Sequence, residues 1–340
     1  MAAFSIKVGF LKYQYIFGIS ILFGTTLSVL SWSCPNLCTC DENKGLVNCT
    51  DRQLIEFPAN VSSYTRILHL GINKLENISW KNFENHGLLT ELNIKRNNLQ
   101  EITDAPFRQL RNLTKLVLRH NGLRTLSSDC FSGLTSLKTL SLSYNNLATF
   151  PENLRTFTPN LKILWVISNE ITVIRPESVN LPKLTRLTLG TNQIHTIERG
   201  TFQNNSRLVF LDLRNNMLSS ITYEFMLQSL GNLKHLDLSE NNIWNISDNA
   251  FIYLKKLETL KLDYNPFYSL PCNIFNDVVS LNQLTLRQKS MEGTAVSGIN
   301  CTDIWSQVIK RLYSIEQIRN NGELIDGDRP VTISDSSLNI

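Results

Sequence analysis

Residues 89–99 read Leu89-Thr90-Glu91-Leu92-Asn93-Ile94-Lys95-Arg96-Asn97-Asn98-Leu99, an eleven-position frame with apolar residues at positions 1, 4, 6 and 11 and asparagine at position 9. A variant copy opens at Thr65, and the frame recurs from Leu113, Leu137, Leu161, Leu184, Leu208, Leu233 and Leu257. The position-9 asparagines are 23 to 25 residues apart: Asn73, Asn97, Asn121, Asn145, Asn169, Asn192, Asn216, Asn241 and Asn265. Nine copies at one spacing predict a stack of structural repeats.

Each type of frame position has a physical role. Residues at positions 4 and 6, such as Leu140 and Leu142, alternate along a short strand and point inward. The buried position-9 amide can both donate and accept, so it predicts an asparagine ladder from coil to coil, and an unpaired group there would cost about 1–3 kcal/mol. Ten residues after the asparagine lies a second apolar anchor, which the repeat of Asn145 replaces by Leu154 and Phe157: Phe83, Phe107, Phe131, Phe202, Phe251 and Phe275.

This pattern predicts an α/β solenoid, a curved horseshoe with a concave parallel sheet and short irregular or helical segments on the convex side. Leu281, Leu284 and Leu286 indicate a degenerate tenth strand. We expect five regions: a signal peptide (1–33), a cysteine-rich N-terminal cap (34–63), the repeat array (64–289), a C-terminal cap with an amphipathic helix (290–320) and a polar tail (321–340).

The N-terminus predicts secretion. Lys7 and Lys12 precede an apolar stretch, and Ser31 and Ser33 place small residues at −3 and −1 of a cut before Cys34. An uncleaved signal anchor is the alternative, since the apolar stretch is long. No later apolar run suggests a membrane span. Seven N-x-Ser/Thr sequons agree with an extracellular location, and none of them falls in the outward concave positions: Asn48, Asn60, Asn77, Asn112, Asn204, Asn245 and Asn300.

The segment Cys34-Pro35-x-x-Cys38-x-Cys40-x8-Cys49 resembles the cysteine-rich N-terminal cap of extracellular leucine-rich-repeat proteins, among them Slit-like, Nogo-receptor-like and lamprey variable-lymphocyte-receptor-like proteins. Sequence alone leaves three connectivities open. The resemblance implies Cys34–Cys40 and Cys38–Cys49, and a zinc site is the alternative. It covers Cys34 to roughly Cys301 at the family level.

The C-terminal side departs from that family, whose cap carries four cysteines. Only Cys272 and Cys301 follow Asn265-Pro266, so we expect a single disulfide between them. A helix then shields the last coil, with apolar residues at helical spacing: Ile304, Trp305, Val308, Leu312, Ile315 and Ile318. Cys130 is left over, and a small buried thiol fits its slot before Phe131; a reactive or intermolecular cysteine is the alternative.

Charge and motifs favour binding over chemistry. The net charge is +4 without a dense Lys/Arg block, so we expect no nucleic-acid partner. None of the five histidines, nor any motif string, forms a recognisable catalytic or metal-binding pattern, so we expect no enzyme activity, no cofactor and no metal.

The outward positions 2, 3, 5, 7 and 8 predict the binding surface. They begin basic, with Lys95, Arg96, Lys115, Arg119, His120 and Lys138, and end acidic, with Asp212, Asp237, Glu240, Glu258 and Asp263. Between them lies an apolar centre: Tyr144, Ile163, Trp165, Ile167, Val209 and Phe210. Exposed apolar patches usually mark interaction sites, although a glycan, a loop or a second copy could cover this one.

We therefore expect a secreted binding protein that recognises a protein or glycoconjugate through its concave face, as in immune or cell-surface recognition. The alternative is a structural role, as an extracellular-matrix organiser or a noncatalytic subunit of a secreted complex. The sequence does not define the oligomeric state.

Overall fold

The computed structural model describes residues 32–222, 227–266, 270–271 and 274–286. The chain divides into a unit of residues 1–31, outside the described residues, and a unit of residues 32–340. Residues 1–31 of the expected signal peptide, Asn300, the expected Cys272–Cys301 pair and the C-terminal helix all lie outside the described residues.

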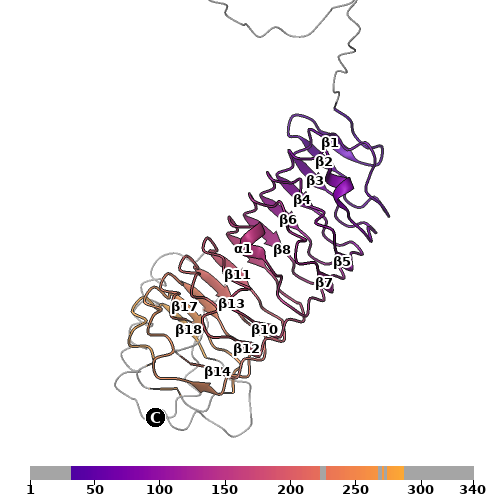
Figure 1. Ribbon diagram of the computed structural model, residues 1–340. Coiled ribbons are helices and arrows are strands. Elements are labelled where there is room, and N and C mark those ends of the chain that lie inside the picture. The colour runs from indigo at the N-terminus through magenta and orange to yellow at the C-terminus, as the bar shows by residue number, and fades with distance from the viewer. Residues whose placement is uncertain (1–31, 223–226, 267–269, 272–273, 287–340) are drawn as a thin grey trace, which may run out of the picture. The chain divides into compact units, whose positions relative to one another are not determined.

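A 12-stranded sheet runs along the described part of the array (Figure 1). Its first two strands, β1 (Thr39–Asp41) and β2 (Leu46–Asn48), pair antiparallel, and every later neighbour is parallel. The later strands, each three residues long, are β3 (Ile67–His69), β4 (Glu91–Asn93), β6 (Lys115–Val117), β8 (Thr139–Ser141), β9 (Ile163–Trp165), β11 (Arg186–Thr188), β13 (Phe210–Asp212), β15 (His235–Asp237), β17 (Thr259–Lys261) and β18 (Gln283–Thr285). β18 is the expected degenerate tenth strand.

The opposite side of the coils carries little regular structure. Three two-stranded sheets lie there: β5 (Glu101–Ile102) with β7 (Thr125–Leu126), β10 (Val173–Ile174) with β12 (Thr196–Ile197), and β14 (Ser220–Ile221) with β16 (Asn245–Ile246). The helices of the described residues are η1 (Trp80–Phe83) and α1 (Leu154–Phe157). α1 occupies the repeat in which the sequence replaces phenylalanine, and it buries Leu154. None of the described helices is long and apolar enough to cross a membrane.

The register of the sheet aligns equal frame positions from coil to coil. Ile67 pairs with Glu91, and Glu91 pairs with Lys115, all at position 3. Neighbouring strands lie about 4.8 Å apart. Residues at one frame position therefore form a row along the array.

The buried rows form the core. The position-4 and position-6 side chains are fully buried, as expected, and so are the phenylalanine anchors from Phe83 to Phe275. Cys130 is 2% exposed, as the buried-thiol interpretation predicts. Burial, followed by the Asp129 charge, raises the pKa of its thiol to about 12. The thiolate that a reactive cysteine needs is thus disfavoured.

The asparagine ladder is confirmed at all nine predicted positions. Asn145 is typical: its Nδ2 donates to Leu118 O of the preceding coil (3.2 Å) and to Leu142 O of its own coil (2.8 Å). Its Oδ1 accepts from Leu123 N (3.2 Å). The amide therefore pairs groups of two coils at the turn where the strand ends, which is why a leucine could not replace it.

The residue before each of these asparagines is left-handed. In all nine coils position 8 has a φ between 53° and 59°, although none of these residues is glycine: Ile72, Arg96, His120, Tyr144, Ser168, Thr191, Asn215, Glu240 and Tyr264. Such a backbone costs roughly 1–2 kcal/mol for an ordinary L-residue. The coils adopt it because the asparagine bonds hold the turn.

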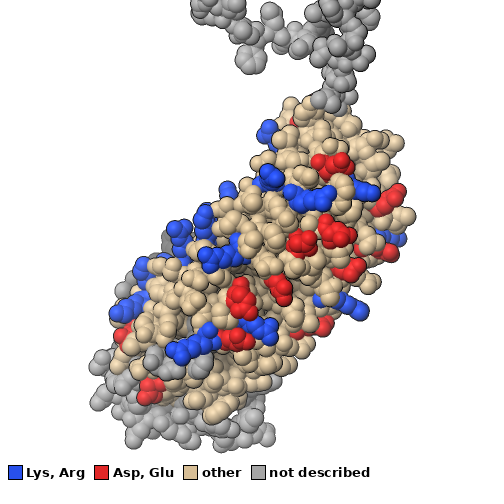
Figure 2. Space-filling model, viewed as in Figure 1, with Lys and Arg blue, Asp and Glu red and all other residues tan. Residues whose placement is uncertain are grey.

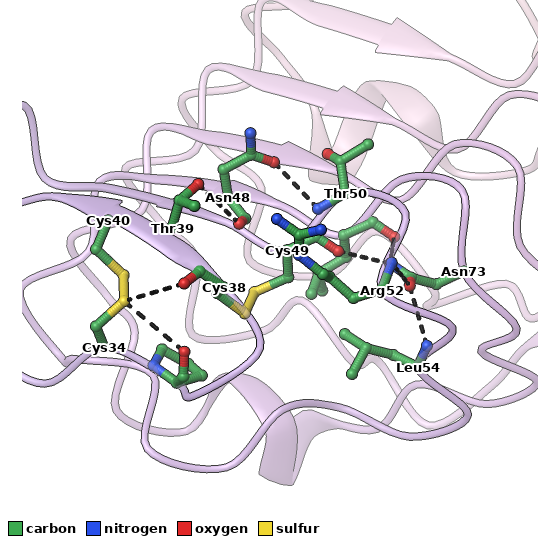
Figure 3. The surroundings of a disulfide bond; sticks show 12 residues. Cys34, Cys38, Thr39, Cys40, Asn48, Cys49, Thr50, Arg52, Leu54 and Asn73 are labelled. Carbon is green, nitrogen blue, oxygen red and sulfur yellow. Dashed lines mark hydrogen bonds between the residues drawn. A yellow bond between two sulfur atoms is a disulfide. The ribbon is translucent and has the colours of Figure 1, made fainter.

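The N-terminal cap continues the sheet. The disulfides Cys34–Cys40 and Cys38–Cys49 are those implied by the resemblance (Figure 3). Asn73, the first asparagine of the ladder, accepts from Arg52 N and Leu54 N and donates to Cys49 O, so the ladder extends into the cap. The cap thus closes the end of the core that the first coil would expose.

Candidate binding surface

The outward face of the sheet carries the predicted apolar centre, but as two parts rather than one. Ile163 and Trp165 lie on β9 and Phe210 lies on β13, with β11 between them. Arg186 pairs with both Ile163 and Phe210, and its guanidinium lies 4.0 Å above the Phe210 ring. The prediction of one continuous apolar centre is therefore wrong, because the intervening repeat places Arg186 between the two parts.

The larger part of the apolar centre groups Ile163, Trp165 and Ile167 with Tyr144 of the preceding coil. Tyr144 is 46% exposed, and the other three side chains are half-buried. The Tyr144 ring stacks on His120, with centroids 4.2 Å apart and planes 7° apart. In the position-5 row, Ser141 and Thr188 are the neighbours of Trp165. The part is therefore an aromatic and aliphatic centre with polar neighbours; we call it the Trp165 patch.

The smaller part consists of Val209 and Phe210. Phe210 packs between the Arg186 guanidinium and the ring of His235, whose centroid is 5.8 Å away. An arginine over an aromatic face shields the ring and presents a cation in its place. This part therefore offers a partner a charged surface.

The expected change from a basic to an acidic end is blurred by ion pairs. At the basic end Lys115 pairs with Glu91 (2.9 Å). At the acidic end Lys261 pairs with Asp237 (3.5 Å) and Lys234 with Glu258 (2.6 Å). The predicted gradient counts charges of one sign at each end, whereas the register places opposite charges in neighbouring coils.

Three described groups at outward positions have shifted pKa values: His120, Asp212 and Glu258. The hydrogen bond from Lys234 lowers the pKa of Glu258. Burial, together with the charges of Arg119, Arg96 and Lys95, lowers the pKa of His120. Burial, with the neighbouring Asp237 carboxylate, raises the pKa of Asp212, although a hydrogen bond from Arg214 N opposes this. Like charges do collect locally, around His120 and around Asp212.

The sequons do not leave the sheet face entirely free. Asn48 lies on β2, in register with His69 at outward position 5, so its side chain belongs to the same face. The expectation that no sequon falls on this face is therefore wrong, because the cap extends the sheet beyond the first repeat. Asn60, Asn77, Asn204 and Asn245 are exposed elsewhere, and Asn112 lies at the edge of the sheet.

Among the described residues, no group of three or more His, Cys, Asp and Glu side chains is placed to hold a metal ion. His69 lies 3.5 Å from a Glu91 oxygen. The outward face presents apolar side chains, aromatic rings, amides and charges of both signs, which are groups that bind a partner by non-covalent contact.

Comparison with known proteins agrees with this architecture. The sequence profile of the leucine rich repeat matches residues 63–123, 87–147, 159–218 and 224–267, more than half of the chain. The chain belongs to the leucine-rich repeat family. It is 30% identical over 169 residues to Toll-like receptor 3 of Boselaphus tragocamelus, covering 42% of this chain and 19% of the relative.

Two other relatives are more completely covered. Lumican of Gallus gallus is 30% identical over 176 residues, covering 44% of this chain and 50% of lumican. Podocan of Mus musculus is 26% identical over 323 residues, covering 87% of this chain and 51% of podocan. The chain thus spans at most about half the length of these leucine-rich repeat relatives.

Two solved structures with leucine-rich repeats resemble it at 28% identity and a TM-score of 0.61. One is the TLR13–ssRNA13 complex, and the alignment covers 66% of this chain and 32% of the matched chain in that complex. The second is the octameric complex of Latrophilin 3, Unc5D and FLRT2 (LRR), and the alignment covers 75% of this chain and 84% of the matched chain.

Proposed function

We propose that this leucine-rich repeat chain is a secreted recognition protein that binds an extracellular protein or glycoconjugate through the outward face of its sheet, without catalysing a reaction. The observation that carries the proposal is the Trp165 patch. Interface hot spots favour Trp and Tyr surrounded by polar residues that exclude water. A solvent-facing strand position has no folding reason to hold tryptophan.

The relatives support binding as the function. The two solved structures are complexes, one with single-stranded RNA and one with other proteins. We favour a protein partner for the Trp165 patch, because its own side chains include no Lys or Arg and the neighbouring Arg186, beside Ile163, is stacked on Phe210. A phosphate backbone requires cations.

The test is binding by the secreted protein with Trp165 replaced by Asp. A buried hot-spot aromatic contributes at least about 2 kcal/mol, so we expect roughly 30-fold weaker binding to a partner captured by proximity labelling on cells. Trp244→Asp is the matched control, because Trp244 is 59% exposed and lies beyond the sheet face. Equal binding by wild type and Trp165→Asp would show that the Trp165 patch does not bind the partner.

A structural role is the second function we consider, as a matrix organiser or a noncatalytic subunit of a secreted complex. Trp244 and Met217, both exposed and both away from the sheet face, favour a second contact surface. This role predicts constitutive assembly in light scattering that Trp244→Asp abolishes and Trp165→Asp does not. A monomer at micromolar concentration would count against it.

A further inference from the structure

A row of cations follows the edge of the sheet where each strand begins. Positions 0 and 2 flank the buried first leucine of the frame, so their side chains leave the coil on the same side. Six successive coils each place one exposed Lys or Arg at one of these positions: Lys138, Lys162, Lys183, Arg207, Lys234 and Lys256. We call this set the cation ridge.

Backbone bonds fix the spacing of the ridge. Lys162 N donates to Lys138 O (2.9 Å), and Thr185 N donates to Lys162 O (2.8 Å). Further along, Lys234 N donates to Val209 O (2.8 Å) in the same way. With strands about 4.8 Å apart, six coils spread their cations over about 24 Å. The ridge therefore has one cation per coil, at position 2 in Lys138, Lys162 and Lys234 and at position 0 in Lys183, Arg207 and Lys256.

Most of the ridge is not neutralised. Lys234 pairs with Glu258 (2.6 Å), but Lys138, Lys162, Lys183 and Arg207 lie within 4 Å of no described carboxylate. Figure 2 shows Lys and Arg side chains following the left-hand edge of the array, with most carboxylates elsewhere on the face in view. Like charges in a row repel, so folding gives no reason for this arrangement.

Amides and hydroxyls accompany the cations. The N-terminal half of the ridge borders an open hollow, which the cations line together with Thr90, Thr114, Ser136 and Asn160. Asn160 Nδ2 donates to Thr135 O (2.8 Å), while its Oδ1 accepts from Lys183 Nζ (2.5 Å). Asn232 repeats this arrangement with Ser206 O (2.8 Å) and Lys256 Nζ (2.7 Å). These asparagines hold two ridge lysines in position.

We propose that the cation ridge binds a linear acidic polysaccharide bearing sulfate or carboxylate groups. One cation in each of six successive coils matches a chain with repeated anions, and the amides and hydroxyls match sugar hydroxyls. No aromatic side chain is among the described residues that line the hollow. Single-stranded nucleic acids bind on stacking aromatic side chains, so the ridge suits a polysaccharide better. This second binding surface shares no residue with the Trp165 patch, although Lys162 directly precedes Ile163 of that patch.

The experiment measures binding of the full secreted chain to heparin, a sulfated polysaccharide, over a series of NaCl concentrations. The test variant is Lys138→Ser/Lys162→Ser/Arg207→Ser. The matched control is Lys74→Ser/Arg124→Ser/Arg155→Ser, which removes three exposed cations away from the ridge. We expect at least about 10-fold weaker binding for the ridge variant, and a decrease of about 2 in the slope of log K against log salt if counterions are released as from single strands. The control should bind like wild type.

A charge-conserving variant, Lys138→Arg/Lys162→Arg/Arg207→Lys, separates charge from fold and should retain binding. Trp165→Asp should retain heparin binding too, so failure of this proposal is distinguishable from failure of the proposed function. Equal losses in the ridge and control variants would overturn the inference, as would undiminished binding to de-sulfated, de-carboxylated heparin. Tighter ridge-dependent binding of poly(U) or of phosphatidylserine vesicles would assign the ridge to nucleic acid or membrane instead.

Discussion

The asparagine ladder and the cation ridge are both rows with one residue per coil, yet one is buried and the other exposed. Each ladder amide pairs backbone groups of two coils, as Asn145 does with Leu118 O of the preceding coil and Leu142 O of its own coil. The ammonium groups of ridge residues such as Lys138 and Lys162, in contrast, form no hydrogen bond with the backbone of a neighbouring coil in the described part of the chain, so the fold does not depend on them. A buried row is thus fixed by the cost of unpaired groups, whereas an exposed row is free to vary. Uniform charge in an exposed row therefore points to a ligand.

The largest effect should follow from breaking the ladder. Asn145→Leu leaves the buried Leu123 N without its side-chain acceptor, at about 1–3 kcal/mol, whereas Leu118 O keeps its second donor, the Asn121 amide (2.9 Å). We expect the free energy of unfolding to fall by roughly 1–3 kcal/mol in urea titrations. Asn146→Ala is the control, because its exposed amide bonds only the Glu170 carboxylate (2.9 Å) and should cost under about 0.5 kcal/mol. Similar losses for the two variants would contradict the role of the ladder.

Two glycines test how tightly the coils stack. Gly133 has a φ of 87°, and a Cβ there would lie 2.3 Å from Arg108 O of the preceding coil. Gly200 has a φ of 80°, but its Cβ would meet only the Gln203 side chain at 3.4 Å. Both alanine variants incur backbone strain of about 1–3 kcal/mol. We expect Gly133→Ala to lower the thermal midpoint well below that of Gly200→Ala; equal midpoints would show that the coils can move apart.

An exposed row can also hold charges that oppose folding. Burial and Asp237 raise the pKa of Asp212, so its ionised form destabilises the fold above that raised pKa. Replacing Asp212 by Asn removes the negative charge but keeps a side-chain oxygen that can accept the hydrogen bond from Arg214 N (2.9 Å). We expect Asp212→Asn to be more stable at pH 7, with the difference shrinking as the pH falls towards 3.8, the ordinary value. A less stable variant at pH 7, measured by thermal melting, would contradict this.

The smallest effect on stability should come from the ridge itself. Replacing Lys138, Lys162 and Arg207 by serine removes no described ion pair and relieves repulsion between neighbours. Surface changes of this kind are usually worth within about 0.5 kcal/mol each. The urea midpoint should therefore be unchanged or slightly raised. A marked loss of stability would mean that the ridge is structural and would weaken the contrast with the ladder.

The buried rows could be predicted from sequence because burial restricts each of them to a narrow class of residues, apolar in the core and asparagine in the ladder. Leu140, Phe131 and Asn145 recur at fixed frame positions, and the structure places all three in the core. Leu154 and Phe157 were even predicted as the exception, and they form α1. The repeat period of the sequence is therefore enough to predict positions where burial limits which residue types can occur.

The outward surface was predicted less well, because it depends on which residues become neighbours. Val209 and Phe210 were joined to Trp165, although Arg186 lies between them in the sheet. The absence of a dense Lys/Arg block was used to exclude nucleic acid, yet Lys138 and Lys162, 24 residues apart, are adjacent in space. A signal was present, one cation at position 0 or 2 in six successive repeats, but it is visible only when the repeats are aligned in register.

The most direct test of the account is the affinity of one partner for three forms of the secreted chain: wild type, Trp165→Asp and Trp244→Asp. The account predicts roughly 30-fold weaker binding for Trp165→Asp and wild-type binding for Trp244→Asp. All three should show the same thermal midpoint. Unchanged binding by a folded Trp165→Asp protein, or an equal loss in Trp244→Asp, would contradict the claim that the outward sheet face is where this leucine-rich repeat protein recognises its partner.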